Sequence, residues 1–180
     1  MQVIKDAVQR WLDDVVIGLN LCPFAAKPNR QKVIRIEVCH ATSEQELSAV
    51  LLHELALLSN TPAQILETTL LVIPDMLQDF YDYNDYLDEA DRLLVEKGFE
   101  GELQIASFHP DYQFAGTDAA DAENLTNRSP YPILHLIREE SLEEVLAKYP
   151  DPDSIPENNI RRVQALTEQE KRQLFPFLFR

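Results

Sequence analysis

The sequence predicts an α/β protein built on a four-stranded mixed sheet, with an α+β arrangement as the alternative. Segments with apolar residues every three or four positions, typical of helices, alternate with short runs of β-branched residues, typical of strands. The resulting order is helix, strand, helix, strand, helix, strand, strand and then helices. Right-handed crossovers should make the first three strands parallel, and we expect the fourth to return antiparallel beside the third.

A chain of 180 residues, 45% of them hydrophobic, is long enough to bury the core of one globular domain. We expect that domain to span residues 1–180. No apolar run reaches about 18 residues, and acids interrupt the N-terminal segment where a secretion signal needs an apolar core. Cys22 and Cys39 are too few for a disulfide framework. These features predict a cytoplasmic protein with no membrane partner.

The balance of charges argues against nucleic-acid binding. Lys and Arg number 16 against 31 Asp and Glu, which gives a formal net charge of -15. Neutralising a phosphate backbone requires clustered cations, and here the cations are outnumbered. We therefore expect no nucleic-acid partner and interpret most of the acids as a solvated surface.

The first predicted helix and strand lie within the first 38 residues. Apolar residues recur at helical spacing over 4–19, and two prolines then forbid helix continuation before the next segment. Residues 33–38 alternate, with Ile34, Ile36 and Val38 on one face of a strand.

The next helix and strand follow the same logic. Ser43 and Glu46 form a capping-box pattern before a helical stripe over 47–58. Residues 68–73 are almost continuously apolar, as expected of a central parallel strand.

A third helix is expected to start at Asp75 or Gln78 and to end at Gly98. Residues 103–108 and 133–137 are the third and fourth predicted strands. A helical C-terminal tail follows, and its apolar end at 174–179 must be buried on its own domain or across a dimer. Three further capping-box patterns mark its helices: Ser141 with Glu144, Ser154 with Glu157, and Thr167 with Glu170.

The carboxyl ends of parallel strands are where open α/β sheets bind ligands, because the loops converge there. An antiparallel fourth strand starts at this same edge. The rule therefore selects side chains after strands one, two and three and before strand four, namely His40, Asp75, His109, Asp111, Arg128, Ser129 and Tyr131. The loop between 109 and 131 is long for a structureless connection, which favours a functional loop or a partly disordered one.

Roles for these residues follow from their chemistry. His109 is the candidate general acid or base, with Asp111 orienting its ring. Arg128 offers a planar fork for a carboxylate or phosphate, with Ser129, Tyr131 and His40 as further substrate-binding residues. The structural alternative for Arg128 is an ion pair with an acid of the loop: Asp118, Asp121 or Glu123.

Cys22 is the candidate nucleophile, since a linker can carry it to the site and a histidine would activate its thiol. The alternative is a buried, inert thiol. His135 falls within the fourth strand, about 13 Å from the level of His109 if the hairpin is tight. The tyrosines and phenylalanine at 80–86 have helical spacing, which favours core packing over an aromatic binding surface.

No motif points to a metal or a cofactor. GxGxxG, GxxxxGK[ST] and GxSxG do not occur, so a Rossmann site, a P-loop and a nucleophile elbow are unsupported. No metal-ligand spacing is diagnostic. We expect no metal site, and the sequence does not indicate whether the protein uses a cofactor.

Three motifs carry a resemblance to a known family: residues 18–24 (GLNLCPF), 107–114 (SFHPDYQF) and 127–132 (NRSPYP). On these the chain resembles the uncharacterised bacterial domain-of-unknown-function family numbered fourteen-fifteen, over nearly its whole length. The resemblance implies a stand-alone bacterial cytosolic protein and carries no activity, cofactor or catalytic residue.

Two functional hypotheses follow. The first is a small-molecule enzyme of hydrolase or transferase type, in which Arg128 holds an anionic substrate, His109 and Asp111 move a proton, and Cys22 or Tyr131 assists. The alternative is a non-catalytic binding or assembly module that uses the apolar tail, and a homodimer is one form of it. A shared site requires Cys22, His109 and Arg128 to converge around one pocket.

Overall fold

The computed structural model describes residues 1–179. The strands are β1 (Ile34–Val38), β2 (Thr68–Val72), β3 (Leu103–Phe108) and β4 (Ile133–Arg138). The α-helices are α1 (Gln2–Trp11), α2 (Ala26–Gln31), α3 (Glu44–Asn60), α4 (Phe80–Glu96), α5 (Glu139–Leu146), α6 (Ile155–Gln164) and α7 (Glu168–Leu174). A π-helix, η1 (Leu12–Ile17), continues α1, and 3-10 turns occur at η2 (Ala122–Asn127), η3 (Pro152–Ser154) and η4 (Pro176–Phe179).

The sheet is four-stranded and mixed, in the order β1-β2-β4-β3. β1 and β2 are parallel, and β4 is antiparallel to both β2 and β3. The first three strands therefore point the same way, as predicted. The predicted strand order was wrong in one respect, because β4 lies between β2 and β3 instead of only beside β3. Its residues Leu134 and Leu136 are fully buried, which a central position explains.

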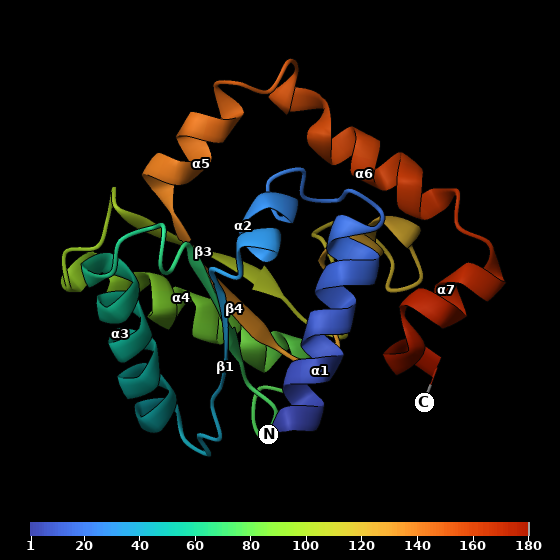
Figure 1. Cartoon of the computed structure of the whole chain (residues 1–180). Helices are drawn as coiled ribbons and strands as arrows, with labels where there is room; N and C mark the ends of the chain where they lie inside the picture. The colour runs from blue at the N-terminus through green and yellow to red at the C-terminus, as the bar shows by residue number, and fades with distance from the viewer. Residues whose placement is uncertain (180) are drawn as a thin grey trace.

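Helices cover both faces of the sheet, and each face has its own core (Figure 1). α3 and α4 cover one face, where they bury the leucines of β4 and Leu71 of β2. α1 and η1 cover the other face, together with residues of α6 and the C-terminal end. Ile34, Ile36 and Val38 all point to this second face, as their alternation predicts.

The helix boundaries agree with some of the predicted signals and contradict others. Ser43 caps α3 and accepts from the Glu46 amide, and Thr167 and Glu170 form a complete capping box on α7. α4 begins later than predicted, at Phe80, with Asp79 as its N-cap. Two predicted caps were wrong: α5 starts at Glu139, before Ser141, and Ser154 precedes α6 without a side-chain hydrogen bond.

The apolar C-terminal end folds back onto the chain itself. Phe175 is fully buried in the core beneath α1, and Leu174, Phe177 and Leu178 pack against the same core. α6 holds the turn after η1, since Asn159 and Arg162 donate to the carbonyls of Leu21 and Leu19 at 2.6 Å each. The tail thus completes an internal core.

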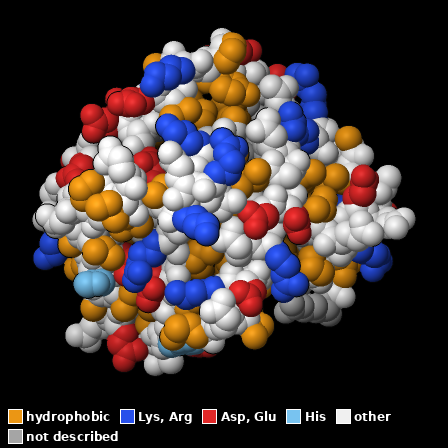
Figure 2. All heavy atoms as spheres, in the orientation of Figure 1, with side chains coloured by type: hydrophobic (Ala, Val, Ile, Leu, Met, Phe, Trp, Pro, Cys, Tyr) orange, Lys and Arg blue, Asp and Glu red, His pale blue; other side chains and the backbone are white. Residues whose placement is uncertain are grey.

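Charge is unevenly distributed over the surface. Residues 15–36 contain no Asp or Glu, and Lys27, Arg30 and Lys32 within this segment are exposed. Figure 2 shows Lys and Arg side chains gathered on the face that carries α2. Within residues 1–179, no helix combines the length and the apolar character needed to cross a membrane.

Candidate functional site

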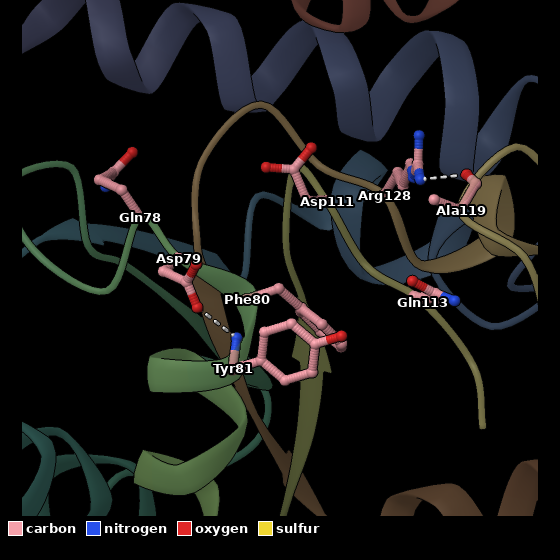
Figure 3. Close-up of a pocket in the computed structure, with 8 residues that line it drawn as sticks. All are labelled: Gln78, Asp79, Phe80, Tyr81, Asp111, Gln113, Ala119 and Arg128. Carbon is pink, nitrogen blue, oxygen red and sulfur yellow. Dashed lines mark hydrogen bonds between the residues drawn. The ribbon is translucent and has the colours of Figure 1, made fainter.

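A groove lies at the sheet edge where β2 and β3 end and β4 begins. It encloses a cavity of about 300 Å³ between the start of α4 and the loop that joins β3 to β4. One wall is formed by Gln78, Asp79, Phe80 and Tyr81, and the other by Asp111, Gln113, Ala119 and Arg128 (Figure 3). Loops from two strand ends converge here, which is the position that sheet topology predicts for a site.

Buried Asn124 gives the β3–β4 loop its shape. Its side-chain carbonyl accepts from the Phe114 amide at 2.9 Å and from the Thr117 hydroxyl at 3.0 Å. Its amide donates to the Asp118 carbonyl at 2.8 Å, and the residue is fully buried. One side chain therefore holds three points of a loop that has no strand of its own, and this loop forms half of the groove.

Arg128 braces the same loop and also reaches the groove. Its Nε donates to the Tyr112 carbonyl at 3.3 Å and its Nη2 to the Ala119 carbonyl at 2.7 Å. The backbone carbonyl of Arg128 accepts from the indole of Trp11 at 2.9 Å. Within the described part of the chain, Nη1 has no hydrogen-bond partner. The predicted structural alternative for Arg128, an ion pair with Asp118, Asp121 or Glu123, does not form among these residues.

Asp111 faces the groove with an exposed carboxylate. Among residues 1–179 its side-chain oxygens accept no hydrogen bond, and it forms no ion pair with Arg128 within 4.0 Å. The two charges still interact. Partial burial lowers the pKa of Arg128, and the nearby Asp111 carboxylate counteracts that effect. The groove thus contains a positive and a negative group that are close but unpaired.

His109 lies behind the groove wall and is fully buried. Its Nε2 donates to the Leu77 carbonyl at 3.0 Å, and its Nδ1 accepts from the Asp111 amide at 3.0 Å. Its ring packs against both Phe80 and Tyr83, with centroids 5.4 and 5.0 Å away. Burial lowers the pKa of His109, which favours the neutral ring that this bonding requires. Both nitrogens are engaged by backbone, so the ring fits a structural role better than proton transfer.

The hydrogen bond from His109 secures a strained turn. Leu77 has a φ of +56°, a left-handed conformation that is uncommon for a bulky residue. This turn delivers Gln78 and Asp79 to the groove, and Asp79 caps α4 by accepting from the amides of Tyr81 and Asp82 at 2.8 and 3.3 Å. His109 thereby connects the two walls of the groove.

The other predicted site residues lie outside the groove. Ser129 is fully buried and its hydroxyl donates to the Tyr131 carbonyl at 2.6 Å, while Tyr131 packs against the core beneath α1. Cys22 belongs to that same core, and burial raises the pKa of its thiol. Among the described residues, neither His109 nor Cys22 lines the groove, so the predicted convergence of Cys22, His109 and Arg128 around one pocket does not occur.

His40 and His135 occupy two further places. His40 follows β1 and its Nδ1 lies 2.6 Å from the Asp75 carboxylate, and both side chains are nearly half exposed. His135 pairs with Ala106 in the sheet, three positions from His109, and its Nε2 lies 2.8 Å from the Thr68 hydroxyl. Burial lowers the pKa of His135 to about 4. As predicted, His135 belongs to the strand, away from the loop ends.

Four polar or aromatic residues that line the groove were not among the predicted site residues: Gln78, Asp79, Tyr81 and Gln113. Helical spacing favours core packing for the aromatic cluster at 80–86, which holds for Tyr83 and Tyr86, whereas Tyr81 is 75% exposed. The position of Tyr81 in the first turn of α4 could have indicated a place at the groove. The first turn of a helix that follows a parallel strand lies at the carboxyl edge of the sheet, where ligands bind. Among the described residues, no cluster of three or more His, Cys, Asp or Glu side chains could hold a metal ion.

A mixed sheet with helices on both faces and a loop-lined groove at the strand ends defines the chain as an α/β protein with a ligand-sized hollow. The family model described as "Protein of unknown function (DUF1415)" matches residues 3–173, so the chain belongs to the DUF1415 family. This is the family that the three sequence motifs indicated. No curated protein and no solved structure matches the chain significantly.

Proposed function

We propose that the protein binds a small molecule with an anionic group in the groove, and that Arg128 is the anion-binding residue. The free Nη1 of Arg128 at the wall of a cavity of about 300 Å³ carries this proposal. Two backbone carbonyls fix the other guanidinium nitrogens, so the charged fork is oriented before a ligand arrives. The cavity lies at the small end of the range for ligand pockets, about 300–1,000 Å³.

The catalytic part of the hypothesis now depends on Asp111. Hydrolase or transferase chemistry needs a group that can exchange a proton with the ligand. The His109 nitrogens are bonded to backbone and the Cys22 thiol lies in a separate core. Both carboxylate oxygens of Asp111 lack hydrogen-bond partners among residues 1–179 and lie at the groove wall, which supports Asp111 as the proton-transfer residue of any such reaction. Binding is the function that the geometry supports best.

Trp11 provides a direct readout of binding. It is the only tryptophan of the chain, and its indole donates to the backbone carbonyl of Arg128. A ligand held by Arg128 should therefore change the tryptophan fluorescence. The probes are inorganic phosphate, phenyl phosphate, acetate and 3-phenylpropanoate, each titrated into the wild-type protein and followed by fluorescence and by thermal shift.

The test variant is Arg128→Lys, which keeps the charge but loses the oriented fork. We expect at least one of these anions to bind the wild type, and its affinity for the variant to fall about tenfold, or 1.4 kcal/mol. Arg30→Lys is the control, because Arg30 is exposed on α2, away from the groove. Equal affinities of wild type and Arg128→Lys for every bound anion would exclude Arg128 as the anion-binding residue.

A further inference from the structure

Within residues 1–179, the side chains that line the groove offer more free hydrogen-bond acceptors than donors. Three carbonyls within 3.5 Å of the Gln78 Nε2 fix its amide, which leaves Oε1 free. Gln113 likewise donates to the Thr117 carbonyl and keeps its Oε1 free, and Asp79 uses only Oδ1 to cap α4. Together with Asp111, these side chains bring to four the acceptor groups that have no partner within the described part of the chain, and Arg128 is the only cationic residue among those that line the groove there. A ligand that is only anionic would leave this surplus of acceptors unmatched.

The unpaired charges of Asp111 and Arg128 indicate which ligand groups would match the surplus of acceptors. Asp111 and Arg128 come from the two ends of the same loop and line the same cavity, but their charged atoms stay more than 4.0 Å apart. Figure 3 shows the two side chains as neighbours on the upper wall of the groove. A ligand with an ammonium beside its carboxylate would match both groups at once, since an ammonium carries three donors and a positive charge.

An extension with aromatic rings in its wall adjoins the charged part of the groove. A second hollow of about 180 Å³ shares Phe80, Tyr81 and Gln113 with the groove and is completed by Phe114, Ala115 and Gly116. Tyr112 packs against this wall, and the centroid of its ring lies 5.2 Å from that of Phe80 and 5.0 Å from that of Phe114. The extension suits an apolar or aromatic side chain, which would stack on exposed Tyr81.

We propose that the groove binds a free α-amino acid with an apolar or aromatic side chain. The carboxylate lies against Arg128, the ammonium against Asp111 and the neighbouring amide oxygens, and the side chain in the extension beside Phe114. This ligand class rests on the proposed function, because the carboxylate uses the same Arg128 site. The acceptor surplus and the separated charge pair are the features that distinguish an amino acid from a plain acid.

Three matched probes test the ligand class: L-phenylalanine, 3-phenylpropanoate, which lacks the amine, and 2-phenylethylamine, which lacks the carboxylate. Each is titrated into wild type, Asp111→Asn, Arg128→Lys and the control Asp85→Asn, with Trp11 fluorescence and calorimetry as readouts. Asp111→Asn is nearly isosteric and removes only the charge of a side chain that makes no hydrogen bond in the described structure, so its fold should be unchanged. Asp85 is an exposed residue of α4 outside the groove lining.

We expect L-phenylalanine to bind wild type and Asp85→Asn at least about tenfold more tightly than either partial analogue. Asp111→Asn should abolish the advantage over 3-phenylpropanoate without weakening 3-phenylpropanoate itself. Equal binding of L-phenylalanine and 3-phenylpropanoate through Arg128 would overturn the amino-acid proposal and leave the proposed function intact. The same conclusion would follow if L-phenylalanine did not bind while other anions still bound. If no anion in either set of probes binds through Arg128, the proposed function is overturned, and the amino-acid proposal that rests on it is overturned as well.

Discussion

Among single residues, His109 is the one whose side chain bonds to both walls of the groove. Replacing it by Phe keeps the aromatic contacts with Phe80 and Tyr83 but leaves the Leu77 carbonyl and the Asp111 amide without partners. We expect His109→Phe to lower the free energy of unfolding by about 1–3 kcal/mol in urea denaturation, since this is the cost of leaving one buried group, the Leu77 carbonyl, unsatisfied. His53→Phe at an exposed position of α3 is the control. A loss below about 0.5 kcal/mol for His109→Phe would show that these bonds contribute little.

His135 makes stability depend on pH. Its pKa is about 4 in the folded protein and 6.5 without burial, so the unfolded chain binds the proton first as the pH falls. The free energy of unfolding should therefore decrease below pH 6.5 and level off near pH 4, by at most about 3 kcal/mol from this residue. Denaturation of His135→Gln and wild type across this range measures the difference in slope. Identical slopes would contradict a buried neutral His135, and His53→Gln should behave as wild type.

Among the structural elements, the β3–β4 loop depends on Asn124. Removing its side chain deletes three hydrogen bonds that join the Phe114, Thr117 and Asp118 positions. We expect Asn124→Ala to lose about 2–4 kcal/mol of stability and to become cleavable by protease near residues 113–121. Asn84→Ala, on the exposed face of α4, is the matched control. Unchanged protease resistance of Asn124→Ala would mean that other contacts define the loop.

On the scale of the whole molecule, the C-terminal end is part of the core. Phe175 is fully buried while Phe179 is 41% exposed. We expect Phe175→Ala to cost about 3–5 kcal/mol and Phe179→Ala less than about 1 kcal/mol, measured by urea denaturation. Similar costs for the two variants would contradict the internal packing of the tail.

The same packing bears on the assembly hypothesis. A tail that fills its own core offers little apolar surface to a second copy. We therefore expect sedimentation to give the same association state for wild type and Phe175→Ala wherever the variant remains folded. A difference in sedimenting mass between the two proteins would support the assembly hypothesis. Without such a difference, the apolar tail gives that hypothesis no support.

The strands show which features of the sheet can be predicted from the local sequence pattern and which cannot. The third strand, Leu103–Phe108, was predicted to the residue, and the directions of all four strands agree with the structure. Alternation and apolar runs are short-range properties, so they can be identified in a single sequence. The insertion of β4 between β2 and β3 is not local, because an antiparallel strand can pair with either neighbour and the core decides between them.

The sequence by itself determined the four strands and the long helices, the sheet edge that carries the groove, and the presence of Asp111 and Arg128 at that edge, but it did not predict the short helix α2, which contains Pro28. Tertiary structure alone decided which polar atoms are free. The His109 Nε2 donates to a carbonyl 32 residues away, and Cys22 packs against the core beneath α1. Periodicity follows from neighbouring residues, whereas the direction of a side chain follows from contacts with distant ones. For this reason the place of the groove was predictable, but the set of free polar atoms that line it was not.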